Sequence, residues 1–225
     1  MATHRDELSA RRLGQQSRRP LLADAAITVL AREGGRGLTH RAVDREAHVP
    51  EGTTKNYYPT RETLLAAAAE RMSEQHRAAV EQLRATTPAT ATPDQIRMLY
   101  PALIRRAVHH DPTQILAMFE LYLEAVRRPA IREALGTMVT ANAEANAELH
   151  HAAGLDSTPA DTGLLDACLL GAIISQLALP ADALRATGLD DPYAIGEQLF
   201  DATAGRAHAD QSEHVAEVIP LTFQG

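Results

Sequence analysis

The sequence has few aromatic residues and almost no cysteine or lysine. Only 4% of its 225 residues are Phe, Trp or Tyr, and tryptophan is missing altogether. With 45% hydrophobic residues and abundant alanine, this composition favours a soluble, largely α-helical chain over a β-sandwich or a disordered polymer. The single cysteine, Cys168, excludes an intramolecular disulfide and fits a reducing compartment.

Segments that would place the chain in a membrane or export it are also missing. No uninterrupted apolar run reaches the roughly 18 residues of a membrane span, and the N-terminus MATHRDELSARR lacks the apolar core of a signal peptide. The sequence therefore predicts a cytoplasmic protein with no membrane partner.

Enzyme and metal motifs are not found either. There is no Gly-rich phosphate loop, no HExxH and no serine-nucleophile motif. Two histidine pairs, at 109–110 and 150–151, do not suit one metal ion because adjacent residues on a helix point about 100° apart. We interpret these histidines as surface or helix-end residues, and we expect neither catalysis nor a metal nor a cofactor.

The net charge of −7 is unevenly distributed along the chain. Residues 1–62 hold 11 Lys and Arg against 8 Asp and Glu, whereas the remainder holds 11 against 21. The N-terminal segment is therefore slightly basic, at +3, while the rest carries −10. This asymmetry is compatible with a nucleic-acid-binding N-terminus, although so small an excess also arises by chance.

The first third of the chain reads as four helices. Apolar spacing predicts helices over residues 19–33, over a short segment capped by Thr39, over 50–58 and over 60–84, with Gly34 ending the first. The two short helices in the middle are separated by a brief turn, which is the arrangement of a helix-turn-helix that inserts its second helix into a DNA groove. The last helix is long enough to connect two domains.

The second part of the chain reads as a helical bundle. A Thr- and Pro-rich stretch at 85–93 marks a domain boundary, and Pro129 begins a long helix that stops at Gly154. About five main helices are predicted, and Pro101 is expected to kink the first of them. A capping residue followed by proline marks four helix starts, at Thr92-Pro93, Asp111-Pro112, Thr158-Pro159 and Asp191-Pro192.

The succession of motif residues between Leu22 and Leu65 resembles the pattern of the tetracycline-repressor (TetR) family of one-component bacterial regulators. His48 departs from the pattern, because the family usually has a glycine in this turn, and Thr54-Lys55 replace a common Leu-Tyr pair. Histidine adopts the left-handed conformation more easily than a branched residue, so we expect the turn to persist. The matching positions are Gly34, Gly37, Thr39, Val43, Ala47, Val49, Gly52, Thr53, Tyr57-Tyr58-Pro59 and Leu64-Leu65.

Both the resemblance and the residue chemistry indicate that the third helix contacts DNA, because this helix is short and its side chains are mostly small and polar. The resemblance implies that Arg41 and Arg61 grip the DNA backbone on either side, and that Tyr58 packs inside while Tyr57 faces phosphate. An ordinary polar helix surface is the alternative. The predicted DNA-contacting residues are Thr39, His40, Arg41, Glu51, Gly52, Thr53, Thr54, Lys55, Asn56, Tyr57 and Arg61.

Four arginines precede the first predicted helix as a basic arm. Such an arm either reaches into an adjacent minor groove or remains a solvated tail, and the sequence does not separate the two. The residues are Arg11, Arg12, Arg18 and Arg19.

The segment LLDACLLGAIISQLAL, residues 164–179, is apolar on nearly every side. A helix of this kind must be covered all round, either by a second copy of the chain or by the protein's own core. In a homodimer, the two helix-turn-helix segments, here called reading heads, would be related by a two-fold axis. Together they would bind a palindromic DNA site. The residues predicted at the dimer interface are Leu165, Cys168, Leu169, Ala172, Ile173, Leu199 and Phe200.

The resemblance also implies that the helices over about 92–154 surround an inducer pocket. Residues of mixed polarity suit such a pocket, although they equally suit a core. The candidates are Tyr100, Met118, Phe119, Tyr122, Met138, Asn142, Asn146 and Gln176.

Taken together, these features predict an all-α protein. Residues 1–62 form an N-terminal arm and helix-turn-helix domain, residues 63–210 a ligand-binding and dimerisation domain, and residues 211–225 a tail with little periodicity. We expect a homodimeric repressor that a small-molecule inducer releases from a palindromic operator in double-stranded DNA. The helix over 60–84 is expected to transmit the change from the ligand-binding domain to the DNA-binding domain. The alternatives are a ligand-independent regulator or activator, or a helical binding or catalytic bundle with a vestigial DNA motif.

Overall fold

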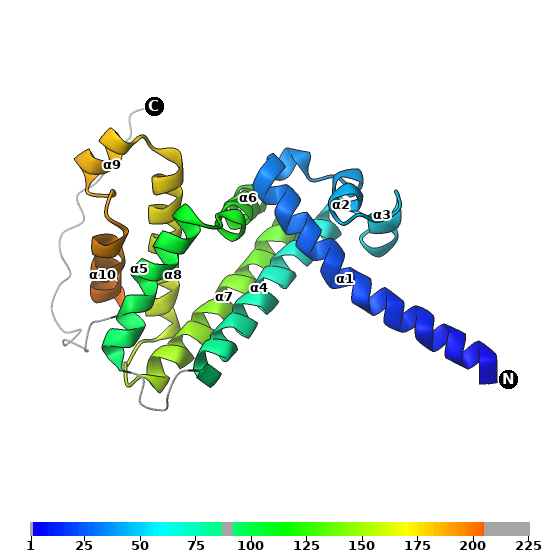
Figure 1. Cartoon of the computed structure of the whole chain (residues 1–225), viewed down its shortest axis with the longest axis horizontal. Helices are drawn as coiled ribbons and strands as arrows, with labels where there is room; N and C mark the ends of the chain where they lie inside the picture. Colours follow the sequence, from blue (N-terminus) through cyan, green and yellow to red (C-terminus); the bar gives the residue numbers. More distant parts are fainter. Residues whose placement is uncertain (1, 87–91, 205–225) are drawn as a thin grey trace.

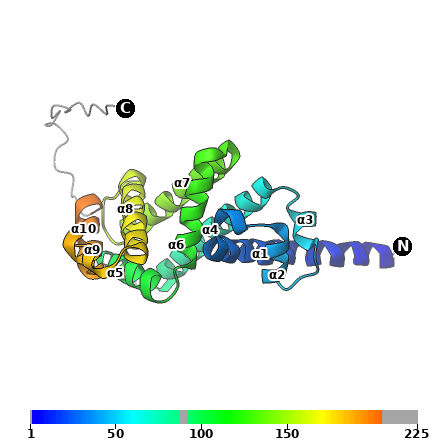
Figure 2. The ribbon, with the colours of Figure 1, turned by 90° about the horizontal axis from the view of Figure 1, so that it is seen from above.

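The computed structural model describes residues 2–86 and 92–204, with side chains from residue 18 onward except those of residues 83, 84 and 86. The described residues form ten helices and no strand, which confirms the all-α prediction. The N-terminal helices lie at one end of the molecule and the last three helices at the opposite end (Figures 1 and 2). The predicted tail at 211–225 lies outside the described residues.

The first helix is longer than the sequence pattern indicates. Helix α1 (Ala2–Gly37) begins well before residue 19, so that Pro20 lies inside it, and its N-terminal half projects away from the other helices (Figure 1). The residues before Pro20 are mostly strong helix formers, and the single hydrogen bond that a proline removes does not prevent the helix from continuing through it. At Gly34, φ is 70° and ψ is 178°, so the regular helix ends there as predicted.

The predicted helix-turn-helix is present in α2 (His40–Glu46) and α3 (Thr53–Tyr57). Thr39 caps α2 as predicted, because its side chain accepts a hydrogen bond of 3.1 Å from the Ala42 amide. His48, in the turn, adopts the left-handed conformation with φ of 52°. This confirms that a histidine serves where the TetR pattern has glycine.

The remaining helices form the bundle. Helix α4 (Arg61–Thr86) runs beside α7 (Pro129–Ala152), and α6 (Thr113–Arg127) packs against both α7 and α1 (Figure 1). Helices α5 (Pro93–His109), α8 (Pro159–Ala178) and α10 (Pro192–Thr203) pack together, with the short α9 (Ala181–Thr187) between α8 and α10 in the chain.

Two details of the bundle differ from the sequence expectations. Helix α5 continues through Pro101 without a break, and α9 was not predicted. Two of the predicted helix starts are confirmed, since Thr92 and Thr158 each form a complete capping box at the predicted positions.

Two apolar clusters hold these helices together. The first joins α1, α2, α4, α6 and α7 around residues such as Leu30, Leu65 and Leu121, and the second joins α5, α8 and α10 to the ends of α4 and α7. The first cluster crosses the boundary predicted at residue 62. The reading head therefore shares its core with α6, so a movement of α6 acts directly on the head.

By length and composition, α8 is apolar enough to cross a membrane, contrary to the expectation that no such segment exists. The expectation was wrong because it required an uninterrupted apolar run, whereas α8 is interrupted only by a few polar residues such as Asp166. Leu165, Leu169 and Ile173 are nevertheless buried in the second cluster, as in the core helix of a helical bundle.

Candidate nucleic-acid interface

The carboxylate of Asp44 locks α3 against α2. Its Oδ2 accepts a hydrogen bond of 2.7 Å from the Gly52 amide, and its Oδ1 accepts bonds from the Thr54 amide at 2.7 Å and the Thr54 hydroxyl at 2.5 Å. Both Asp44 and Thr54 are buried, at 2% and 0% exposure. A carboxylate with three donors in a dry site holds its partners firmly, so α3 is presented as a rigid unit.

The outer face of α3 carries free polar groups. Lys55 and Asn56 are exposed, and Lys55 makes no ion pair with any described residue. Thr53 donates its hydroxyl to the Pro50 carbonyl at 2.6 Å, and Tyr57 is half-buried against the first cluster. Gly52, at the start of α3, has φ of 89°, a conformation that favours glycine.

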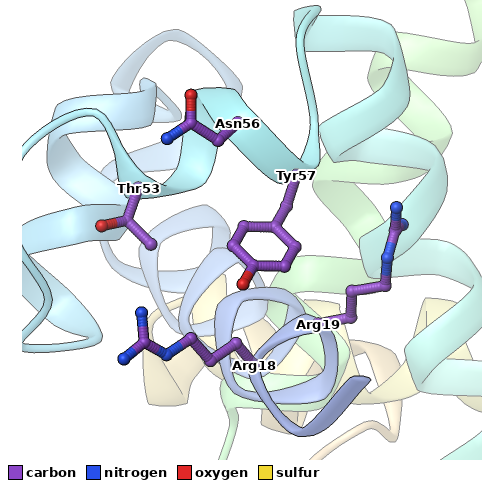
Figure 3. Close-up of a pocket in the computed structure, with 5 residues that line it drawn as sticks. All are labelled: Arg18, Arg19, Thr53, Asn56 and Tyr57. Atoms are coloured by element: carbon purple, nitrogen blue, oxygen red, sulfur yellow. The ribbon is translucent and has the colours of Figure 1, made fainter. Parts of the chain in front are cut away.

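A cleft of about 290 Å³ separates α3 from α1 (Figure 3). Thr53, Asn56 and Tyr57 line one side, and Arg18 and Arg19 line the other. The Arg19 guanidinium lies 5.9 Å from the centre of the Tyr57 ring, within cation–π range. The cleft therefore combines two positive charges with a phenol, an amide and a hydroxyl, which are the groups that bind phosphate oxygens.

Tyr58 packs inside, as predicted, at 7% exposure. Its hydroxyl donates a hydrogen bond of 3.1 Å to the Arg19 carbonyl, and the Arg19 guanidinium lies 5.5 Å from its ring. Burial raises the pKa of Tyr58, although the nearby Arg19 charge acts in the opposite direction. Tyr58 therefore fixes the spacing between α1 and α3 and with it the width of the cleft.

Four further residues predicted to contact DNA belong to α2, its cap and the turn. Arg41 and Glu51 are both largely exposed and form an ion pair of 2.5 Å with each other. The His40 ring nitrogen Nε2 lies 2.6 Å from the Tyr58 carbonyl oxygen, and it ties the start of α2 to the end of α3. Thr39 is exposed, but its hydroxyl is already engaged in the helix cap.

Two residues predicted to contact DNA are placed elsewhere. Thr54 is completely buried against Asp44, because this position of α3 faces α2. Arg61 donates hydrogen bonds to the carbonyl oxygens of Leu38 and Gly35 and forms an ion pair of 3.0 Å with Glu124. Its guanidinium is therefore used inside the protein, and both predictions are corrected.

Two features of this site were not predicted from the sequence: the role of Asp44 and the position of Arg18 and Arg19. An aspartate inside a short helix gives no sign that it will be buried, because that depends on how α3 crosses α2. Arg18 and Arg19 were assigned to an arm before the first helix, whereas they are exposed on α1 itself. The side chains of Arg11 and Arg12 lie outside the described residues.

The predicted ligand-pocket residues divide between two places. Met118 and Met138 belong to the first cluster, whereas Tyr100 belongs to the second. Phe119 and Gln176 are half-buried, and the Nε2 of Gln176 has no hydrogen-bond partner in the described part of the chain. Asn142 and Asn146 are buried on α7, whereas Tyr122 on α6 is 36% exposed.

The residues predicted at a dimer interface mostly face inward. Leu165, Leu169, Ala172, Ile173 and Phe200 are buried in the second cluster, and Cys168 and Leu199 are half-buried. The prediction is corrected for the buried residues, because an all-round apolar sequence does not tell which stripe of α8 faces outward. The exposed stripe consists of Ala160, Leu164, Ala167, Gly171 and Ala178.

One histidine predicted at the surface is buried. His150 has no exposed surface, and its ring nitrogens lie 2.5 Å from the Tyr100 hydroxyl and 2.8 Å from the Ser157 hydroxyl. Burial lowers the pKa of His150 to about 4, so the ring is neutral near pH 7. Ser157 donates in turn to the Ala204 carbonyl at 3.1 Å, so this buried chain secures the end of α10. No three potential metal ligands gather among the described residues.

Comparison with known proteins agrees with this architecture. Residues 91–194 match the family described as tetracyclin repressor-like, C-terminal domain. No curated protein matches the chain.

Several solved structures are similar over most of their length. The multidrug binding protein EbrR in complex with ethidium is 26% identical, covers 83% of this chain and 98% of its own, and has a TM-score of 0.59. A TetR-family member from Streptomyces coelicolor is 29% identical, with coverages of 83% and 98% and a TM-score of 0.57. A TetR-family regulator from Rhodococcus sp., at 21% identity, coverages of 84% and 99% and a TM-score of 0.60, shares the fold.

Proposed function

We propose that this chain, a member of the TetR family of transcriptional regulators, is a homodimeric repressor that leaves a palindromic operator when a small molecule binds its C-terminal helices. The observation that carries this proposal is the rigid presentation of α3, which Asp44 locks from behind while Lys55 and Asn56 stay free on the outer face. A short polar helix of this kind fits a major groove.

The positions of the arginines support DNA as the partner. Arg18 and Arg19 stand beside α3 across the cleft, so one phosphate group can be held between α1 and α3 while Lys55 contacts the groove. Such contacts fix the position of the reading helix on the duplex but do not select bases. Base selection then falls to Thr53, Lys55 and Asn56.

The exposed stripe of α8 supports dimerisation. Leu164 is 56% exposed, and Ala167 and Gly171 continue the same face with no charged side chain between them. Small residues allow two helices to approach closely, and a two-fold axis brings the same stripe of each copy together. Two reading heads on one assembly would double the contacts with a palindromic site.

The link between α6 and the head supports regulation by a ligand. Glu120 on α6 accepts a hydrogen bond of 2.7 Å from the Gly35 amide, and Glu124 pairs with Arg61. A ligand that favours another position of α6 would therefore alter the head, in proportion to its preference for that state. Structures of EbrR are complexes with ethidium, proflavin and malachite green, so small aromatic molecules are reasonable inducers for this chain.

A gel-shift assay on the chain's own upstream DNA, backed by selection from random duplexes, tests this proposal. We expect a palindromic site, binding by two copies and release by an inducer. Absence of any selected sequence at low salt, where phosphate contacts are strongest, would contradict the proposal. A DNA binder acts in the cytoplasm, so we also assign the protein to that compartment.

A further inference from the structure

Asp166 is a carboxylate in the interior of the helical bundle without a cationic partner. It lies on α8 with part of its surface still accessible, and its Oδ2 accepts a hydrogen bond of 3.0 Å from Asn146 Nδ2 on α7. No charged group of opposite sign acts on it among the described residues. Withdrawing a carboxylate from water without a counter-charge is costly, so such a group indicates a functional site more often than a structural one.

A second buried acceptor lies on α7. Asn142 stands one turn before Asn146 on the same face of α7, and it is only 8% exposed. Its Oδ1 is buried with no hydrogen-bond partner in the described part of the chain. Asn146 donates from its Nδ2 to Asp166 instead, and its Oδ1 lies 3.2 Å from His76 Nε2 of α4. One buried acceptor therefore lacks a donor one helical turn from the asparagine that binds the Asp166 carboxylate.

Two aromatic rings complete the surroundings. Burial raises the pKa of Tyr122 on α6, and the negative charge of Asp166 adds to this effect, which places the phenol within electrostatic reach of the carboxylate. The pKa of Tyr100 on α5 is also raised, first by burial and then by the negative charge of Asp166. Tyr122 is 36% exposed, so it stands where the cluster meets solvent. Aromatic faces and a carboxylate attract the same kind of ligand, a cation with a flat apolar body.

We propose that Asp166 anchors an organic cation, an amidinium or ammonium group on an aromatic body, with Asn142 Oδ1 as a second acceptor and Tyr122 at the entrance. The inference rests on the proposed function, because it names the chemical class of the inducer. The ligand would supply a counter-charge to Asp166 and a donor to Asn142 Oδ1. Tyr122 belongs to α6, the helix whose Glu120 binds the Gly35 amide and whose Glu124 pairs with Arg61. A cation bound beside Tyr122 would therefore act on the helix that contacts the reading head.

Benzamidinium and benzamide test this proposal, since they share size and shape and differ in charge. Calorimetric titration of the full chain should show benzamidinium binding about tenfold or more tightly than benzamide, the discrimination expected of a partly buried ion pair. Asp166→Asn should remove that preference while leaving benzamide binding within about twofold of wild type. Asp190→Asn, an exposed aspartate outside the cluster, is the matched control and should retain the preference. Circular dichroism confirms that each variant is folded.

Equal binding of the two probes to the wild type, or an unchanged preference in Asp166→Asn, would overturn the cation site. Gel shifts with the same proteins separate this failure from that of the proposed function. If the chain binds its operator but shows no charge preference, only the cation site falls. If benzamidinium binds through Asp166 but no DNA is bound, the regulator proposal falls and the cation site stands.

Discussion

Arg61 and Glu124 form an ion pair of 3.0 Å between the first turn of α4 and the C-terminal part of α6. The same guanidinium donates to the carbonyl oxygens of Leu38 and Gly35, where α1 gives way to α2. Glu124 also accepts from Arg128 at 2.7 Å. One partly buried charge network therefore fastens the reading head to the bundle.

Arg61→Ala should lower the stability of the fold more than it weakens individual DNA contacts. It leaves two carbonyl groups and the Oε1 atom of Glu124 without the donor that Arg61 provides, which costs about 2 kcal/mol of unfolding free energy. Urea denaturation measures this loss. Arg105→Ala, an exposed arginine on α5, is the control and should change the free energy by less than about 0.5 kcal/mol. Equal stability of the two variants would contradict the assignment of Arg61 to the interior.

Lys55→Ala should weaken operator binding without affecting the fold, because the side chain is exposed and unpaired. Removing one phosphate or base contact costs about 1 to 3 kcal/mol in binding and, if the contact is to phosphate, reduces the salt slope by about one. Tyr57→Phe should act in the same direction, since its phenol faces the cleft beside Arg18. Gel shifts at several salt concentrations measure both effects, and wild-type affinity in both variants would argue against α3 as the reading helix.

Thr54→Val should destabilise the reading head even though the residue contacts no DNA. Valine preserves the volume of the side chain but leaves Asp44 Oδ1 with one donor fewer, which costs about 1 to 2 kcal/mol. Thr53→Val, on the outer side of the same helix, is the matched control. A thermal shift confined to Thr54→Val is the expected result. If Thr53→Val shifted the melting temperature equally, the buried lock would not be the cause.

Gly171→Glu should dissociate the proposed dimer while leaving each copy folded. A Cβ at Gly171 meets nothing within 4 Å, so the new side chain is tolerated by the single chain but places like charges on the two-fold axis. Gly136→Glu on α7 introduces the same residue at an equally open position and serves as control. Analytical ultracentrifugation should show monomers only for Gly171→Glu. Persisting dimers would place the interface on another face.

Acid sensitivity should depend on two buried groups that act in opposite directions. Burial lowers the pKa of His150 from 6.5 to about 4, so the unfolded chain takes up more protons over that interval and stability falls as the pH falls. Burial raises the pKa of Asp166 from 3.8 to about 6, so the folded chain takes up more protons there and stability rises as the pH falls. In the wild type these contributions oppose each other.

Asp166→Asn removes the compensating contribution. Between pH 6 and pH 4 the variant should therefore lose about 2 kcal/mol more unfolding free energy than the wild type, which is what a pKa of about 6 for Asp166 in the folded chain contributes over this interval. Urea denaturation at successive pH values measures the difference. Parallel pH profiles for the two proteins would show that the Asp166 carboxylate keeps an ordinary pKa.

The local chemistry of the sequence was enough to predict the main helices and the family pattern, although not the short α9 or the N-terminal extension of α1. Thr39, Thr92 and Thr158 cap their helices as predicted, because a capping bond joins residues two or three positions apart and needs no distant partner. The left-handed backbone at His48 is equally local. These features identified the helix-turn-helix and the bundle before any packing was known.

The tertiary structure alone decided which side chains remain free. Thr54 and Arg61 look like DNA-binding residues in the sequence, yet the crossing of α3 over α2 buries one and the approach of α6 engages the other. The outward stripe of α8 and the unpaired carboxylate of Asp166 depend in the same way on which helices surround α8. Partners far apart in the chain determine burial and charge pairing, and residue spacing along a single helix carries no information about them.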